Sequence, residues 1–144
     1  MQKENMLLVD GFSLAYRCYY AYPGHLTSPA NDPINVLLGF TTIMLKTIEA
    51  MDIQKICVCF DRKEPTFRHE QFSDYKGHRP PPPDDFIVQL PVLKELLTKL
   101  NIYQVEKAGF EADDLMGSLA KQFETNYNVF LFTNDHDALQ LVND

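Results

Sequence analysis

Short apolar runs alternate with longer segments of helical periodicity along most of this chain. Four such runs, rich in apolar and β-branched residues, predict strands: Met6–Val9, Lys55–Phe60, Ile102–Val105 and Asn128–Thr133. Strands that alternate with helices favour a parallel sheet covered on both faces. A length of 144 residues predicts one domain. The expected fold is therefore three-layer α/β, with a mainly parallel sheet flanked by helices.

Three of the intervening segments have the spacing of amphipathic helices. The clearest is Ala112–Phe123, with apolar residues at i, i+3, i+4, i+7, i+8 and i+11. A second, Val36–Met51, is apolar on more than one face, so we expect it to be well buried. The third, Phe86–Leu100, contains Pro91, which predicts either a kink or a fresh first turn at that point.

Residues 62–85 interrupt the alternation. This segment is polar, contains four consecutive prolines near its end, and is too long for a plain connection. Residues 62–79 carry five basic and three acidic side chains, in a protein whose net charge is −7. A long basic insertion is either a solvent-exposed loop without a role or a functional flap. Long ordered insertions are more often functional.

Acidic residues recur where the predicted strands end. The carboxyl ends of parallel strands share one edge of a sheet, where such folds bind their ligands. We expect seven carboxylates to gather at this edge: Asp10, Asp61, Glu111, Asp113, Asp114, Asp135 and Asp137. When these seven are set aside, 13 acidic residues remain against 13 lysines and arginines. The excess negative charge is thereby assigned to one place.

Each of these carboxylates alone has an ordinary structural explanation, as a helix-start residue or a turn residue after a strand. Their joint occurrence is harder to explain, because two bare carboxylates about 4 Å apart repel by roughly 4 kcal/mol at an effective dielectric near 20. Protonation or a bound cation relieves such repulsion. Oxygen ligands favour Mg²⁺ or Mn²⁺ over zinc, and alternation sends His136, between two of the carboxylates, to the opposite side.

A pair of hard cations beside a basic segment predicts phosphodiester hydrolysis. One cation would generate hydroxide from a bound water, and the pair would clamp the attacking and leaving oxygens. Arginine and lysine side chains of the segment would hold the scissile phosphate. Tyr75 and Phe67 offer flat faces for an unpaired base, although packing explains such aromatic residues equally well.

Five motifs, in this order and spacing, resemble those of a known family: LLVDGFSLAYR, FDRKEPTFRHE, YKGHRP, FEADDL and TNDHDALQL. The family is the 5′ nuclease domain (5′–3′ exonuclease and flap endonuclease) at the N-terminus of bacterial DNA polymerase I, related to the PIN-like nucleases. The resemblance covers essentially the whole chain. It implies a PIN-like, Rossmann-like fold in which the insertion at about 62–85 forms a basic arch above the site.

The resemblance also implies roles for individual residues. The expected ligands of a first Mg²⁺ or Mn²⁺ ion are Asp10, Asp61, Glu111 and Asp113, and those of a second are Asp114, Asp135 and Asp137. The expected catalytic cations, matching the phosphate-activating residues of the arch, are Arg68 and Lys76. The expected DNA contacts are Tyr75, Arg79 and Arg17, the last on a short helix after the first strand. The partner would be DNA with a single-stranded 5′ end or flap, recognised by shape rather than by base sequence.

The chain departs from the family pattern in several places. Asn134 replaces a small residue and His136 a basic one beside the Asp-x-Asp pair, while no carboxylate or arch cation is lost. The family also continues past Asp144, through a further ligand region and a helix-hairpin element that grips duplex DNA. We therefore expect residues 1–144 to be the catalytic lobe without that part or a polymerase domain. An incomplete second metal site and weak or absent cutting would follow.

Two other functions remain to be weighed. A non-catalytic module of the same fold would bind branched DNA without cutting it; truncation favours this function and the retained carboxylates oppose it. A phosphoryl-transfer domain also clusters aspartates around Mg²⁺. Receiver domains, however, need an acidic pair after the first strand, where this chain has Asp10-Gly11, and aspartate phosphatases need Asp-x-Asp there.

Composition bears on location and redox state. No apolar run approaches the about 20 residues of a membrane span, and the N-terminal apolar stretch is too short for a signal peptide. A cytoplasmic, monomeric protein is expected. The three cysteines, Cys18, Cys57 and Cys59, contain no C-x-x-C pair, and the last two share one face of a predicted strand. They are predicted to be reduced core residues.

Overall fold

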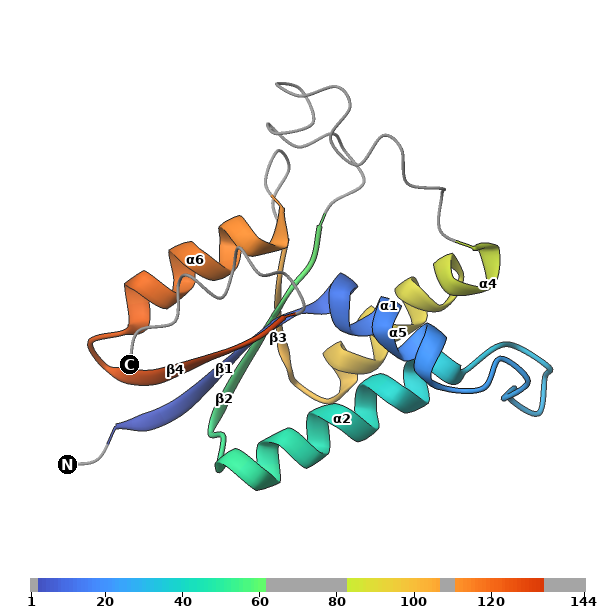
Figure 1. The fold of residues 1–144 in the computed structure, drawn as a ribbon, viewed down its shortest axis with the longest axis horizontal. Coiled ribbons are helices and arrows are strands. Elements are labelled where there is room, and N and C mark those ends of the chain that lie inside the picture. The colour runs from blue at the N-terminus through green and yellow to red at the C-terminus, as the bar shows by residue number, and fades with distance from the viewer. Residues whose placement is uncertain (1–2, 62–82, 107–110, 134–144) are drawn as a thin grey trace, which may run out of the picture.

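The computed structural model describes residues 3–61, 83–106 and 111–133, without the side chain of Asp113. The elements follow one another along the chain as drawn in Figure 1: β1 (Glu4–Asp10), α1 (Gly11–Ala21), α2 (Asn35–Met51), β2 (Lys55–Cys59), α4 (Asp84–Ile87), α5 (Gln89–Lys99), β3 (Tyr103–Val105), α6 (Ala112–Phe123) and β4 (Tyr127–Phe132). Each predicted strand is present, and each begins and ends within two residues of its predicted position.

The four strands form one parallel sheet in the order β3-β2-β1-β4. β1 is central, with β2 on one side, where Leu8 lies beside Cys57, and β4 on the other. β3 pairs with the far side of β2. The prediction of a parallel α/β sheet is confirmed, and it places the carboxyl ends of all four strands at one edge.

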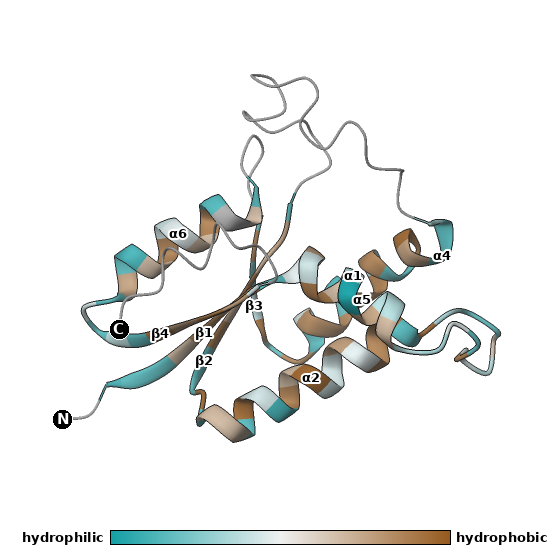
Figure 2. Cartoon of the chain, viewed as in Figure 1, coloured by the Kyte–Doolittle hydropathy of each residue, from teal (hydrophilic) through white to brown (hydrophobic). Residues whose placement is uncertain are grey.

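Helices cover both faces of the sheet (Figure 1). Leu7 and Val9 of β1 pack against α1, α2, α4 and α5 in one core cluster, whereas Met6 and Leu8 pack against α6 in another. Figure 2 shows hydrophobic residues along the strands and on the helices beside them. The central strand is therefore apolar on both sides, as expected for a sheet buried between two layers. The three-layer prediction is confirmed.

The prediction that the second helix is well buried holds for only one of its sides. α2 buries Val36, Phe40 and Met44 toward the sheet, but Leu38 and Leu45 on its outer side are exposed, Leu45 to 57%. Hydrophobicity alone did not separate the two sides, because only the position of the sheet decides which apolar side chains are covered.

The third predicted helix is two helices. α4 ends at Ile87 and α5 begins at Gln89, so Pro91 lies in the first turn of α5, where its missing N–H costs no helical hydrogen bond. Of the two predicted alternatives, the chain therefore begins a new helix near Pro91 and does not kink a continuous one. α4 begins at Asp84, which corrects the predicted end of the insertion at about 85; residues 62–82 lie outside the described residues.

All three cysteines are buried and carry free thiols, which confirms their prediction as reduced core residues. Cys18 packs in the cluster beneath α1, and Cys57 and Cys59 pack in the cluster beneath α6. In the part of the chain that the structure describes, no helix combines the length and the apolar character needed to cross a bilayer.

Candidate active site

The carboxyl edge of the sheet brings together acidic residues from three parts of the chain. Asp10 is the last residue of central strand β1, Asp61 follows β2 by two residues, and Glu111 caps the start of α6. Asp10 and Glu111 are only 6% and 5% exposed, respectively. Burial of carboxylates is costly unless they are hydrogen-bonded or paired, so the contacts of each side chain are informative.

Asp10 is held by the helix that it caps. Its Oδ1 accepts a hydrogen bond of 3.1 Å from the backbone N–H of Ser13, which satisfies one of the free donors in the first turn of α1. Its Oδ2 lies 3.5 Å from the hydroxyl of Thr133, the residue after β4. The carboxylate is therefore fixed between the ends of two neighbouring strands.

Asp61 joins the end of β2 to the start of α6. Its Oδ1 accepts a short hydrogen bond of 2.6 Å from the backbone N–H of Ala112, the first residue of that helix. The negative charge also faces the positive end of the helix dipole. This one contact brings the acidic start of α6 to the same edge as Asp61.

Glu111 and Asp114 form a reciprocal capping box at the start of α6. The Glu111 side chain accepts from the backbone N–H of Asp114, and Asp114 Oδ2 accepts from the backbone N–H of Glu111 at 3.2 Å. These two acids thus do have the ordinary structural role of capping the start of a helix. A carboxylate has several acceptor positions, so a capping role is compatible with a further ligand.

A glycine permits the close approach of α1 to β2. A Cβ atom added at Gly11 would lie 2.5 Å from the ring of Phe60, far inside van der Waals contact. Phe60 is almost fully buried and immediately precedes Asp61. The absence of a side chain at Gly11 lets α1 begin directly beside the end of β2, which places Asp10 next to the chain that leads to Asp61.

A buried thiol lies beneath the acidic edge. Cys59 is the register partner of Asp10 across β1 and β2, and it is fully buried in the cluster under α6. Its pKa is raised above the ordinary thiol range by the hydrogen bond with Cys57, by burial and by the nearby charge of Asp10. Cys59 is therefore a neutral thiol in the apolar layer next to Asp10.

The family described as the 5′-3′ exonuclease, N-terminal resolvase-like domain, matches residues 5–144 of the sequence. The chain belongs to this family. As a 5′-3′ exonuclease N-terminal domain, it carries the parallel sheet and the acidic strand ends described above.

Curated relatives of this exonuclease domain include DNA polymerase I of Synechocystis sp., 42% identical over 142 residues, covering 95% of the chain and 14% of the relative. The thermostable DNA polymerase I of Thermus thermophilus is also 42% identical, over 99% of the chain and 17% of the relative. The chain thus spans less than a fifth of the length of these proteins.

Two solved structures share the fold of this exonuclease domain. The T5 5′-exonuclease with zinc ions bound has a TM-score of 0.76 and 22% identity, covering 98% of the chain and 53% of that structure. The catalytic core of Rad2 in complex with DNA substrate has a TM-score of 0.58 and 18% identity, covering 95% of the chain and 41% of that structure.

Only part of the predicted site of the exonuclease domain falls on described residues. Asp10, Asp61, Glu111 and Asp114 lie at the carboxyl edge as predicted, and Arg17 is exposed on α1. Within residues 3–61, 83–106 and 111–133, no three His, Cys, Asp or Glu side chains form a group that would hold a metal ion. The remaining predicted positions lie outside the described side chains: Arg68, Tyr75, Lys76, Arg79, Asp113, Asp135 and Asp137.

Two residues at this edge of the exonuclease domain were missed by the sequence reasoning. Thr133, expected only as a strand residue, contacts Asp10; its place directly before the acidic Asn134–Asp137 stretch was the available signal. Lys94 of α5 lies over the Phe60 ring, with its Nζ 4.9 Å from the ring centroid, and pairs with Glu106 at 3.4 Å. No local pattern in the sequence connects Lys94 with Phe60, because α5 and the residue that follows β2 meet only in the folded chain.

Proposed function

We propose that the chain is the catalytic lobe of a nuclease that hydrolyses DNA phosphodiester bonds at 5′ ends or 5′ flaps with the help of divalent metal ions. The observation that carries this proposal is the burial of the Asp10 and Glu111 carboxylates at the carboxyl edge of the sheet, with Asp61 fixed between β2 and α6. Buried acids at a ligand-binding edge are costly for stability and useful for metal chemistry.

The donor chemistry of this edge fits hard divalent cations. The side chains that gather there supply oxygen only, which suits Mg²⁺ or Mn²⁺, and Cys59 below them is neutral. By family resemblance, two ions would be held, one by Asp10, Asp61, Glu111 and Asp113, and the other by Asp114, Asp135 and Asp137. When bound, such ions supply a nucleophilic hydroxide and stabilise charge on the phosphate oxygens.

The chain's own residues would then bind and orient the substrate. Arg68 and Lys76 would hold the scissile phosphate and offset the charge that develops on it. Arg17 and Arg79 would contact neighbouring phosphates, and Tyr75 would stack on an unpaired base. Hydrolysis adds water across one P–O bond, leaving a phosphate on one fragment and a hydroxyl on the other.

The proposed partner is DNA with a single-stranded 5′ end or flap. The names of the relatives support DNA as the substrate class, since they are DNA polymerases, an exonuclease and a DNA-bound catalytic core. We propose further that residues 1–144 act as one monomeric lobe in the cytoplasm.

A second candidate is a module that binds branched DNA without cutting it. One observation favours it: the described carboxylates do not by themselves form a group that would hold a metal ion. Such a module would retain the arginines and lose the metal dependence.

A cleavage assay separates the two functions. We expect any cutting of a labelled 5′-flap duplex by this chain to be weak and to need Mg²⁺ or Mn²⁺, and Asp10→Asn or EDTA to abolish it. Asp52→Asn is the matched control, because Asp52 is exposed, lies at the amino edge of the sheet and has a positive φ of 52° that Asn tolerates. Cutting that persists in EDTA contradicts the metal mechanism. Tight flap binding without any cutting supports the binding module.

A further inference from the structure

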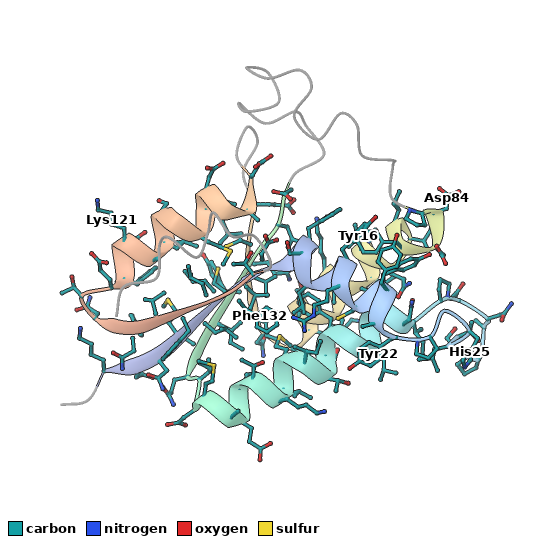
Figure 3. The ribbon with its side chains drawn as sticks, viewed as in Figure 1. Tyr16, Tyr22, His25, Asp84, Lys121 and Phe132 are labelled. Atoms are coloured by element: carbon teal, nitrogen blue, oxygen red, sulfur yellow. The ribbon has the colours of Figure 1, made fainter. Side chains whose placement is uncertain are left out.

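α4 packs on one face of α1 through a single buried aromatic side chain. Phe86 of α4 is fully buried, and its ring meets the rings of Phe12, Tyr16 and Tyr19 edge-on, with centroids 5.4, 5.1 and 5.7 Å away. These three residues are spaced i, i+4 and i+7, so they line one face of α1. Figure 3 shows Tyr16 on the side of α1 that faces the helix carrying Asp84.

A strong hydrogen bond reinforces this contact at the surface. The Tyr19 hydroxyl donates to Asp85 Oδ1 at 2.6 Å, a length typical of bonds to a charged acceptor. The bond to Asp85 is the main cause that raises the pKa of Tyr19 to about 12. Tyr19 is therefore a donor throughout the physiological pH range.

A buried pair of amides holds the same junction from inside. Asn35 and Gln89 are 1% and 2% exposed, and Gln89 Nε2 donates to Asn35 Oδ1 at 2.9 Å. Gln89 also donates to the backbone carbonyl of Asp85 and accepts from the N–H of Val36. Asn35 donates to the carbonyl of Tyr19 at 3.0 Å. Three helix ends, those of α1, α2 and α4–α5, are thus fixed to one another.

This junction of α1, α2, α4 and α5 lies where the basic segment, residues 62–82, rejoins the described part of the chain. The basic segment 62–82 begins after Asp61, which is tied to α6, and ends at Pro83, whose carbonyl accepts from the N–H groups of Phe86 and Ile87 in α4. α1, on which α4 docks, begins beside Asp10. One end of the basic segment is therefore tied to α6, and the other packs on α1, the helix that Asp10 caps.

We propose that Tyr19 and Asp85 are positioning residues of the nuclease: with the Asn35–Gln89 pair behind them, they fix the point at which the basic segment rejoins the fold relative to Asp10. This proposal rests on the proposed function. Tyr19 and Asp85 touch no reacting atom. They act by holding α4, and with it the residue at which the basic segment rejoins the described fold, against α1.

The test uses four single substitutions in the 144-residue chain. Tyr19→Phe and Asp85→Ala remove the hydrogen bond, Asp85→Asn keeps an oxygen acceptor, and Asp84→Ala removes a charge from the same first turn without touching Tyr19. The first measurement is hydrogen exchange at the amides of Phe86, Ile87 and Val88. We expect Tyr19→Phe and Asp85→Ala to speed exchange there at least 5-fold, and Asp84→Ala to leave it within 2-fold.

The second measurement is binding and cutting of a 5′-flap duplex with Mn²⁺. We expect Tyr19→Phe and Asp85→Ala to lower kcat 5- to 20-fold with the melting temperature nearly unchanged, Asp85→Asn to recover most of the loss, and the double variant to be no worse than Asp85→Ala. A purely structural role would move the melting temperature and leave kcat intact.

Several results would overturn the proposal. If Tyr19→Phe leaves hydrogen exchange at the α4 amides unchanged, the hydrogen bond does not hold α4 in place and the proposal has no physical basis. Faster exchange with wild-type cutting shows that the junction does not position the nuclease, and leaves the proposed function standing. A wild-type chain that neither binds nor cuts flap DNA overturns the proposed function and the positioning role together.

Discussion

The Asp61 carboxylate accepts a 2.6 Å hydrogen bond from the backbone N–H of Ala112, and this contact connects the end of one strand to the start of a helix 51 residues later. Asp61 therefore has a structural role besides its proposed place in the metal site. The two roles are separable, because the structural one needs an oxygen acceptor and the other needs negative charge.

We predict that Asp61→Ala and Asp61→Asn have different effects on stability and the same effect on activity. Asp61→Ala leaves the N–H of Ala112 without its acceptor and should lower the free energy of unfolding by about 1–2 kcal/mol. Asp61→Asn keeps an oxygen and should lower it by about 0.5 kcal/mol or less. Urea denaturation measures both, and flap cleavage should be lost in both. Equal stability losses would contradict the assignment of the hydrogen bond.

Gly11 is predicted to tolerate no side chain. A Cβ at this position would lie 2.5 Å from the Phe60 ring, so Gly11→Ala should cost about 1–3 kcal/mol of stability through overpacking. Gly24→Ala is the matched control, because nothing lies within 4 Å of a Cβ there, and it should change stability by less than about 0.5 kcal/mol. Adding Phe60→Leu to Gly11→Ala should restore part of the loss in a thermal melt.

Sequence patterns predicted those parts of the molecule that depend on local periodicity. The spacing of apolar residues gave the bounds of α6, Ala112–Phe123, and the parallel arrangement of strands followed from their alternation with helices. Because parallel strands share an edge, the placement of Asp10 and Asp61 at that edge was also predictable. These inferences need only the period of a helix or strand and the handedness of connections.

Contacts between distant segments were not predictable in the same way. The Tyr19–Asp85 bond joins residues 66 apart, and the Asn35–Gln89 bond joins residues 54 apart. Their partners are chosen by how three helices pack, and no local pattern shows this. The exposure of Leu45 was missed for the same reason, because hydropathy does not say which side of a helix a sheet will cover.

The Tyr19 hydroxyl provides a prediction with a defined pH window. The bond to Asp85 raises the pKa of Tyr19 to about 12, above the value of about 10 for an unperturbed tyrosine. A raised pKa means that the protonated form is favoured in the folded state, so the stabilisation is complete below about pH 10 and is lost as the pH rises toward 12. Asp85→Ala should lower the pKa of Tyr19 toward 10 in an NMR titration of its ring carbon, and Asp84→Ala should not. A Tyr19 that titrates near 10 in the unsubstituted chain would refute the bond.

The cysteines are predicted to be unreactive in the native chain. Burial raises the pKa of Cys18 to about 11, which lowers its thiolate fraction at pH 8 about 100-fold relative to a thiol of pKa 9. Cys57 and Cys59 are also buried. A disulfide reagent should therefore label the native protein slowly and all three thiols rapidly in denaturant. Rapid native labelling of even one thiol, located by mass spectrometry, would contradict the burial described here.

Metal binding should be visible as a change in stability even if cutting is slow. A dication that binds the folded chain and not the unfolded one stabilises the fold by mass action. At a concentration about ten times its Kd, Mn²⁺ should raise the free energy of unfolding by about 1.4 kcal/mol, which raises the melting temperature by about 3–6 °C.

Asp10→Asn keeps a good N-cap for α1 while it removes the charge. Its metal-free melting temperature should therefore equal or exceed that of the unsubstituted chain, and its response to Mn²⁺ should be largely lost. Asp52→Asn, at the opposite edge of the sheet, should retain the full response. If the unsubstituted chain melts at the same temperature with and without millimolar Mn²⁺, the acidic edge does not bind a cation, and the buried carboxylates of Asp10 and Glu111 act only as helix caps.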